Sequence, residues 1–428
     1  MGDVNGAVDT IRDRMSYGAF DWVVSDQDVR DSMAALADLS PSERNEAISQ
    51  LDDTALERLT GNAEEMGASE RQEVYNKLVE GLDGTQLGRL AQTFGGDNRI
   101  GRVDFANAVA SHASTDAKVA FIAATKDSIN GDYSATQGQD GNPETLAVAK
   151  VLASLSNDQA AFDSAVKSLS EGQLEDVIAV GLGRNYYPTY NTGSYSFDPS
   201  AALSIIDAAT NSTDLQVKGA VFEAATKHFN TVDGLAPDNS YRDAITSLIE
   251  SDPNGLVNEL QSRTDLTGSS LVDYAKEMLE SGKEQDLRNL LVQMQQGNDG
   301  KGNAFGNFSD PAFARNLGFL TGSIAAAINS ITDDAESQAD LLKNIFGTAF
   351  GAGGAANPAA GVIASVGNGI TAVTIDGIVD GVKNGNKDLK QALYELAIPR
   401  GPDGSVNMTG TGYDAFNASY AAVAEVNR

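Results

Sequence analysis

Apolar residues recur at helical spacing along almost the whole chain. Steps of three and four residues place apolar side chains on one face of an α-helix. Two of the clearest runs are Ala47, Ile48, Leu51, Ala55 and Val74, Leu78, Val79, Leu82. Strand-like alternation is scarce by comparison, so the sequence predicts an all-α protein.

Several helix starts are marked by a capping residue followed by proline. Proline suits the first helical position because its missing N–H would have no partner there. The pairs of this kind are Ser40-Pro41, Asp198-Pro199, Asp252-Pro253 and Asp310-Pro311. After Pro311 the apolar pattern predicts a helix that extends to Ile331.

A pair of similar segments indicates an internal duplication. The motif FIAATK at 121–126 returns as FEAATK at 222–227, and the Ser-Thr-Asp at 114–116 returns at 212–214. The two offsets, 101 and 98 residues, are nearly equal. Helical repeats bury their apolar faces against neighbouring copies, so we expect stacked helical repeats followed by a C-terminal helical domain. The predicted regions are 1–113 (N-terminal helical region), 114–211 and 212–300 (the repeat copies), and 301–428 (C-terminal domain).

One long segment of the C-terminal domain carries no charged side chain. It covers the 32 positions of 344–375 and consists mainly of Gly, Ala and β-branched residues. Pro358 should end a helix there, because proline lacks an N–H and its ring clashes with a preceding carbonyl. We therefore expect a Gly/Ala-rich apolar hairpin over 337–382, in which small residues let two helices approach closely. The hairpin residues of interest are Gly347, Gly351, Pro358, Gly361, Gly367 and Gly369.

Two interpretations of this hairpin remain open. In the first it is the buried centre of the C-terminal domain, wrapped by helices at 311–331 and 387–396. In the second it inserts into a membrane when acidification protonates the carboxylates at its ends and so lowers their desolvation cost. The uncharged part of its second arm, 359–375, would be about 25 Å long as a helix. That length is close to the ~30 Å of a hydrocarbon core.

The net charge of −30 restricts the possible partners. A chain with 60 acidic and 30 basic residues repels a phosphate backbone, so we expect no nucleic-acid binding. Cysteine is absent, which excludes disulfides and thiolate ligands, and His112 and His228 are too few for a histidine-rich metal centre. We expect no metal and no other cofactor. The first residues lack a secretory signal pattern, which predicts either a cytoplasmic protein or secretion without a cleaved signal peptide.

Residues 183–198 form the strongest predicted loop and gather four tyrosines. Tyrosine combines a large apolar area with a polar tip, which suits contact with sugars or proteins. The alternative is a loop that folds back over the helical array. The candidate binding residues are Tyr186, Tyr187, Tyr190 and Tyr195. Residues 95–105 resemble a calcium loop only superficially, because several ligand positions lack an oxygen.

Three features resemble helical regions of secreted bacterial effectors and polymorphic toxins. They are the turn–helix unit at 82–90, the two FxAATK segments, and residues 340–347 leading into the Gly/Ala-rich stretch. The resemblance implies delivery into, or action on, another cell. The C-terminal part carries no recognisable nuclease, deaminase or transferase residues, so we expect a non-enzymatic effector or toxin.

These observations leave three functional hypotheses. The first is a pore-forming type of protein whose hairpin engages membranes. The second is a soluble helical-repeat scaffold that binds a protein partner through its array. The third is a hydrolase of a cell-wall polymer with an acidic active site near the tyrosines, although no motif selects one pair among the many carboxylates.

Overall fold

The computed structural model describes eleven stretches of the chain, and all statements below concern these stretches. They are residues 3–16, 24–63, 66–94, 99–130, 143–182, 199–229, 240–263, 269–296, 310–347, 372–397 and 409–424. Within them the chain forms α-helices and one short 3-10 turn, with no strand. The predicted all-α fold is therefore confirmed for the described residues.

The chain divides into two compact units. Unit 1 comprises residues 1–225 and 231–244, and unit 2 comprises 226–230 and 245–428. The helices up to the division are α1 (Val4–Arg14), α2 (Asp26–Ala37), α3 (Pro41–Gln50), α4 (Asp53–Gly61), α5 (Ala68–Val79), α6 (Gly84–Thr93), α7 (Arg99–His112), α8 (Thr115–Thr125) with the 3-10 turn η2 (Lys126–Ser128), α9 (Pro143–Ala153), α10 (Gln159–Ser168), α11 (Glu171–Gly181) and α12 (Ser200–Asn211). The boundary between the units falls within α13 (Leu215–Thr226) and α15 (Ser240–Glu250).

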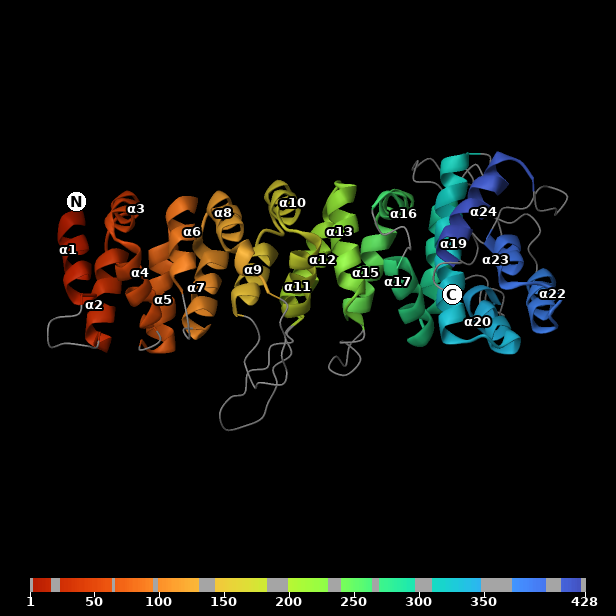
Figure 1. The fold of residues 1–428 in the computed structure, drawn as a ribbon, viewed down its shortest axis with the longest axis horizontal. Helices are drawn as coiled ribbons and strands as arrows, with labels where there is room; N and C mark the ends of the chain where they lie inside the picture. The colour runs from red at the N-terminus through yellow and green to blue at the C-terminus, as the bar shows by residue number, and fades with distance from the viewer. Residues whose placement is uncertain are drawn as a thin grey trace, which may run out of the picture. The chain divides into compact units, whose positions relative to one another are not determined.

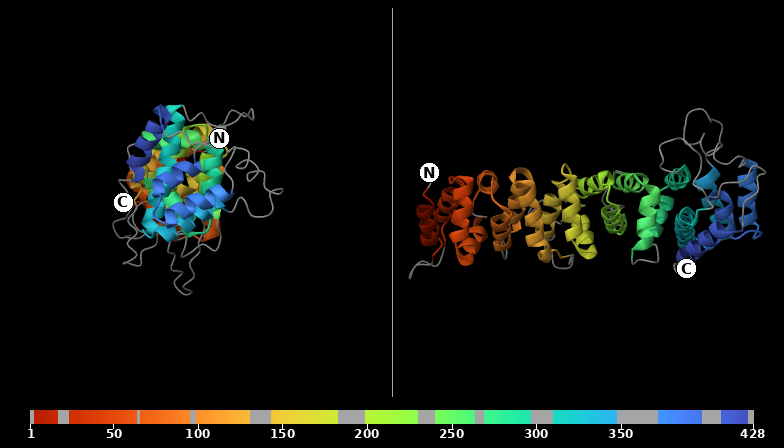
Figure 2. Two further views of the ribbon diagram at one scale, coloured as in Figure 1. Left: turned by 90° about the vertical axis from the view of Figure 1, so that its right-hand side faces the viewer. Right: turned by 90° about the horizontal axis from the view of Figure 1, so that it is seen from above.

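Unit 1 is a two-layer helical array. In one layer α4 packs on α6, α6 on α8, and α8 on α10, while in the other α5 packs on α7, α7 on α9, and α9 on α11. Figures 1 and 2 show these helices following one another in chain order, from red through orange to yellow. Each helix thus buries its apolar stripe against the helix two places further along, as stacked helical repeats do.

Glycines set the closest approach within the first layer. A Cβ on Gly84 would lie 2.3 Å from Cβ of Ala120, and a Cβ on Gly88 would lie 2.8 Å from Cβ of Ala124. Residues four apart in α6 thus meet residues four apart in α8 in the same order. The two helices therefore run parallel, with less than a side chain between their backbones.

The same direction holds for the neighbouring pairs of this layer. Thr60 at the end of α4 donates a hydrogen bond to the carbonyl of Thr93 at the end of α6, at 2.8 Å. Lys126, directly after α8, lies 3.4 Å from the carbonyl of Ser168 at the end of α10. Because these C-terminal ends lie together, the N-terminal ends of α4, α6, α8 and α10 share the opposite edge of the layer.

Local capping explains where many helices begin. The predicted pairs Asp252-Pro253 and Asp310-Pro311 each place an aspartate at the N-cap and proline at the first helical position. Ser40 forms a capping box with Glu43, whose carboxylate accepts from the Ser40 backbone N–H at 3.1 Å. Pro199 differs from the prediction: its ψ of 4° lies outside the helical range, so α12 begins one residue later.

Unit 2 is built around one buried helix. Its helices are α16 (Pro253–Ser262), α17 (Ser269–Glu280), α18 (Glu284–Gln296), α19 (Pro311–Ile331), α20 (Ala335–Gly347), α22 (Ala372–Lys383), α23 (Leu389–Ala397) and α24 (Thr411–Ala424). The bounds of α19 are the predicted ones, Pro311 and Ile331. Helices α16, α17, α18, α20, α23 and α24 all contact α19, and 15 of its 21 residues are buried. The helix at the centre of the described part of unit 2 is therefore α19.

Two glycines let α24 lie directly against α19. A Cβ on Gly318 would lie 2.4 Å from the Phe416 carbonyl oxygen, and a Cβ on Gly322 would lie 2.8 Å from that of Tyr420. The small-xxx-small spacing that we expected in the hairpin thus operates here, between α19 and α24. Phe416 is fully buried and packs edge-on against Tyr394 of α23. This contact holds α23 against α24.

Candidate functional site

Most of the residues singled out in the sequence lie outside the described part of the chain. Gly347 is described as the last residue of α20. The others are Gly351, Pro358, Gly361, Gly367, Gly369, Tyr186, Tyr187, Tyr190 and Tyr195. The binding loop and the turn of the hairpin therefore remain predictions.

The described ends of the predicted hairpin pack against each other. Helices α20 and α22 are in contact, and Nζ of Lys383 at the end of α22 lies 2.5 Å from Oε1 of Glu336 at the start of α20. Their buried faces include Leu342 and Ile345 on α20 and Ile378 on α22. The charged start of α20 and the charged end of α22 thus lie together. Among the described helices, none is both long enough and apolar enough to cross a membrane.

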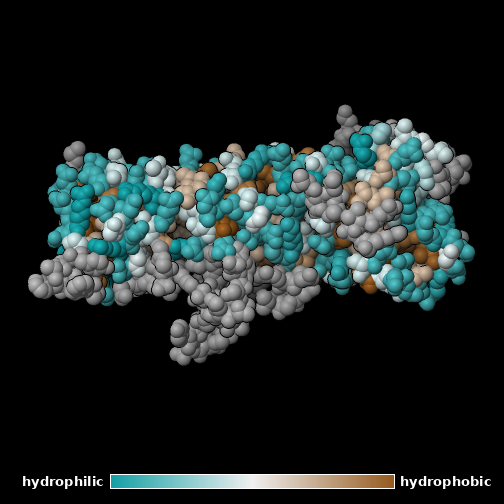
Figure 3. Space-filling view, viewed as in Figure 1, coloured by the Kyte–Doolittle hydropathy of each residue, from teal (hydrophilic) through white to brown (hydrophobic). Residues whose placement is uncertain are grey.

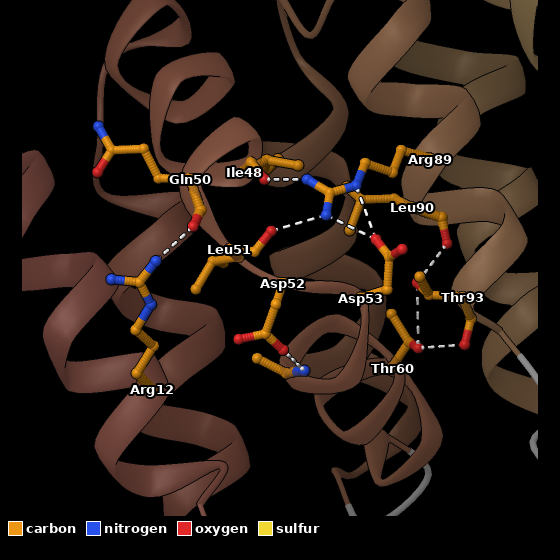
Figure 4. A network of polar contacts seen from close by, with 11 residues as sticks. Arg12, Ile48, Gln50, Leu51, Asp52, Asp53, Thr60, Arg89, Leu90 and Thr93 are labelled. Atoms are coloured by element: carbon orange, nitrogen blue, oxygen red, sulfur yellow. Dashed lines mark hydrogen bonds and ion pairs between the residues drawn. The ribbon is translucent and has the colours of Figure 1, made fainter.

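Arginines of unit 1 bind the C-terminal carbonyls of neighbouring helices (Figure 4). Arg89 of α6 donates to the carbonyls of Ile48 and Leu51, each at 2.7 Å, and pairs with the Asp53 carboxylate at 2.6 Å. Arg12 of α1 donates to the carbonyl of Gln50 at 2.6 Å. The last carbonyls of a helix have no partner within the helix and carry partial negative charge, so a guanidinium stabilises them.

Arg44 is the most buried example and has five carbonyl partners. The residue is 4% exposed, and burial lowers the pKa of its guanidinium. It lies in α3 and joins the C-terminal ends of α2 and α5. The acceptors, at 2.7 to 3.2 Å, are the carbonyl oxygens of Leu36, Ala37, Leu39, Leu78 and Glu80.

Because these arginines bind backbone carbonyls, the surface of unit 1 stays strongly acidic. Unit 1 contains 38 acidic and 17 basic residues, a formal net charge of −21. In its described part the exposed basic residues are Arg12, Lys77 and Lys167, and each already has a hydrogen-bond or ion-pair partner. Hydrophilic residues cover most of the described face of these helices in Figure 3. The exposed carboxylates are Asp3, Asp9, Asp13, Asp26, Asp38, Glu46, Asp52, Asp53, Glu57, Glu70, Glu73, Glu80, Asp83, Asp116, Asp127, Asp158, Glu171, Asp207 and Asp243.

Some of these carboxylates form a row that we call the acidic edge. It consists of Asp52, Asp53, Asp83, Asp116 and Asp158, which lie at the N-terminal ends of the parallel helices α4, α6, α8 and α10. Three of them cap their helix by accepting from a backbone N–H, at 2.8 to 3.2 Å. Capping and the helix dipole together favour a carboxylate at these positions.

A small cavity lies where α6, α7, α8 and α9 meet. Its volume is about 40 Å³. Nη1 of Arg102 in α7 forms a close ion pair with Oε1 of Glu144 in α9, while Nε of Arg102 is buried without a hydrogen-bond partner. Burial lowers the pKa of Arg102 to about 10, so the guanidinium stays charged at neutral pH. This pair could not be predicted from the sequence, because its members lie 42 residues apart on different helices.

A second buried polar group lies in unit 2. The hydroxyl of Tyr274 in α17 lies 3.1 Å from Oγ1 of Thr246 in α15. Burial raises the pKa of Tyr274, and the charges of Asp286 and Glu250 raise it further. Burial also raises the pKa of Glu250, with Asp286 adding to the effect. Glu250 is therefore protonated more readily than a glutamate in water.

The described residues hold no group of three or more His, Asp or Glu arranged to bind a metal ion. Comparison with known proteins assigns no function to these residues. No protein-family model, no curated protein and no solved structure matches the chain.

Proposed function

We propose that unit 1 is a helical-repeat scaffold that binds a cationic partner protein along its acidic edge. The observation that carries this proposal is the distribution of charge. Arginines bind helix ends inside the array, so the exposed carboxylates keep most of their charge uncompensated. Such a field attracts a partner of opposite charge and raises its rate of association.

The described surface also favours polar over apolar recognition. The exposed large apolar side chain among the described residues is Ile331, which belongs to unit 2. An apolar anchor on the described part of unit 1 is therefore not available to a partner, and charge has to supply specificity. Binding that relies on exposed ion pairs weakens as salt screens them.

The spacing of the acidic edge defines the partner further. Packed helices lie about 8–10 Å apart, whereas an extended chain advances about 3.3 Å per residue. An extended segment with Lys or Arg at every third position therefore brings one cation to each helix of the layer. A peptide of the same composition whose lysines are clustered cannot bring one cation to each helix.

The test uses these two peptides and fluorescence anisotropy at low and high salt. We expect the full chain to bind the regularly spaced peptide more tightly, and to lose binding as salt increases. The triple variant Asp83→Asn, Asp116→Asn, Asp158→Asn keeps the capping function, because asparagine caps as well as aspartate. Each exposed ion pair contributes about 0.2–1 kcal/mol, so the triple variant should bind roughly 3- to 140-fold more weakly.

The matched control removes three exposed carboxylates of unit 2, Asp340→Asn, Asp376→Asn and Asp380→Asn. It changes the net charge equally but leaves the acidic edge intact, so it should bind nearly as the unchanged chain does. Equal weakening by both triple variants, or equal affinity for both peptides, would show that only net charge matters and would refute the role of the edge.

A second candidate function is membrane engagement by the 337–382 hairpin. The pairing of α20 with α22 favours it, because the two arms already pack on each other and an ion pair joins the start of α20 at Glu336 to the end of α22 at Lys383. The test is dye release from liposomes between about pH 7 and pH 4.5, the range in which carboxylates begin to titrate. We expect release to rise on acidification and to be abolished by Gly361→Asp. Gly377→Asp is the control, since Gly377 is exposed with open space around it. Absence of release at every pH would exclude this function.

A further inference from the structure

The cavity between α6, α7, α8 and α9 combines aromatic walls with one unused hydrogen-bond donor. The rings of Phe94 and Phe105 have centroids 4.9 Å apart, and Tyr75 packs edge-on against both. These contacts hold the two phenylalanines in place, and Phe121 of α8 lines the cavity with them. The walls therefore offer rigid, flat, apolar surfaces.

The donor is Nε of Arg102. The ion pair between Nη1 and Glu144 fixes the guanidinium, so that Nε–H keeps one orientation. Nε is buried and has no hydrogen-bond acceptor among the described residues. A buried donor without a partner is unfavourable, so a group that brings an oxygen acceptor to it is bound with a net gain.

The charge of the site selects an uncharged group. Arg102 and Glu144 neutralise each other, so a carboxylate entering the cavity would lose its hydration without meeting a net positive charge. A carbonyl oxygen can accept from Nε at a much smaller desolvation cost. Thr125 also lines the cavity, and its hydroxyl donates to the carbonyl of Phe121 at 2.8 Å. The oxygen of Thr125 is thereby left as an acceptor for a ligand N–H.

The volume selects a very small group. A cavity of about 40 Å³ holds roughly three water-sized atoms, since one needs about 10–15 Å³ on this measure. A carboxamide has three non-hydrogen atoms, is planar, and carries both an oxygen acceptor and an N–H donor. It matches the cavity in size, shape, charge and hydrogen bonding.

We propose that this cavity binds a primary carboxamide, with its oxygen accepting from Nε of Arg102 and its N–H donating to Oγ1 of Thr125. The carboxamide comes either from a free small amide or from an Asn or Gln side chain of a bound partner. The site does not depend on a cationic partner. Its test is therefore separate from that of the proposed scaffold function.

The experiment observes the Nε–H resonance of Arg102 by ¹H–¹⁵N NMR on the full chain. Acetamide, acetate and the apolar control isobutene, which all have the same number of non-hydrogen atoms, are titrated separately. We expect acetamide to shift the Arg102 resonance with a Kd on the order of 1 mM, as ligand efficiency permits for four heavy atoms. Acetate should bind at least tenfold more weakly. A Gln-containing tripeptide compared with its Glu and Ala counterparts then tells a side-chain carboxamide from a free amide.

Variants add a second readout. Arg102→Lys removes Nε but keeps a cation opposite Glu144, so acetamide should no longer perturb the resonances of Phe105 and Thr125. Thr125→Val keeps the shape and removes the hydroxyl, and should weaken acetamide binding several-fold. Backbone spectra confirm that each variant is folded. Acetate binding as tightly as acetamide, or an Arg102 resonance that no amide moves, would overturn the proposal without any need for variants.

Discussion

The buried arginine of α3 provides the sharpest test of how the array is held together. Arg44→Met keeps most of the side-chain volume and removes every donor. Five carbonyls at the ends of α2 and α5 then lose their partner. Arg12→Met is the matched control, because Arg12 is exposed and donates to the carbonyl of Gln50.

The expected magnitude follows from burial. Hydrogen bonds to a charged group contribute about 1.5–3 kcal/mol each, so five would give at least about 7 kcal/mol if no carbonyl regained water. The ends of α2 and α5 can relax toward solvent, which reduces the loss to that of a few buried carbonyls without a partner, about 3–5 kcal/mol in all at roughly 1–3 kcal/mol each. For Arg12→Met we expect less than about 1 kcal/mol, because water replaces the arginine.

The assay is urea unfolding followed by far-UV circular dichroism, with hydrogen exchange to assign the change to α2 and α5. With a slope of about 2 kcal/mol per molar urea, Arg44→Met should lower the midpoint by roughly 1.5–2.5 M and Arg12→Met by less than about 0.5 M. Arg44→Lys, which keeps the charge but has fewer donors, should fall between them. A midpoint for Arg44→Met no lower than that for Arg12→Met would refute the view that this arginine joins the two helices.

Two further predictions concern unit 2. Gly318→Ala should destabilise by about 1–3 kcal/mol in thermal or urea unfolding, because the new Cβ would lie 2.4 Å from the Phe416 carbonyl oxygen. Gly377→Ala, where nothing lies within 4 Å, should instead stabilise α22 by up to about 1 kcal/mol. Glu250 has a raised pKa, so its protonated form favours folding and this contribution is lost as pH rises through that pKa. Glu250→Gln should therefore stabilise more at about pH 7 than at about pH 4, and Asp286→Asn should lower the pKa of Glu250 in an NMR titration. A Glu250→Gln effect that is independent of pH would contradict this assignment.

Local chemistry made the helices predictable. The apolar pattern after Pro311 gave both ends of α19, and an aspartate before proline gave the starts of α16 and α19. These signals act within a few residues, so they can be read from the chain directly. The same reasoning predicted Pro199 as the first residue of α12, whereas Pro199 is the N-cap and the helix begins at Ser200.

Contacts between distant residues could not be read in the same way. Arg44 reaches carbonyls up to 36 positions away, and the Arg102–Glu144 pair spans helices α7 and α9. The sequence predicts that an arginine lies on a helix. It does not predict whether the guanidinium pairs with a surface carboxylate or binds the carbonyls at the end of a neighbouring helix. One of the two interpretations of the hairpin, burial at the centre of the C-terminal domain, rests on the lack of charge in 344–375 and stays a prediction, because most of that segment lies outside the described residues. α19 occupies the centre of the described part because it is uncharged over most of its length and also carries Gly318 and Gly322 for close packing.

The arginine contacts also connect the fold of unit 1 to its charge. A cation that binds helix carbonyls neutralises partial charges of the backbone, and Arg89 does so while it pairs with one exposed carboxylate, Asp53. The contacts of such an arginine therefore set the stability of a helix joint, whereas the total charge of unit 1 sets the long-range field around it. This separation predicts that Arg89→Lys, which keeps the charge but cannot hold two carbonyls and Asp53 with one planar fork, lowers stability while leaving long-range attraction of a cationic peptide unchanged. An equal loss of both would mean that the peptide recognises the ordered α3–α4 turn and not the field around it.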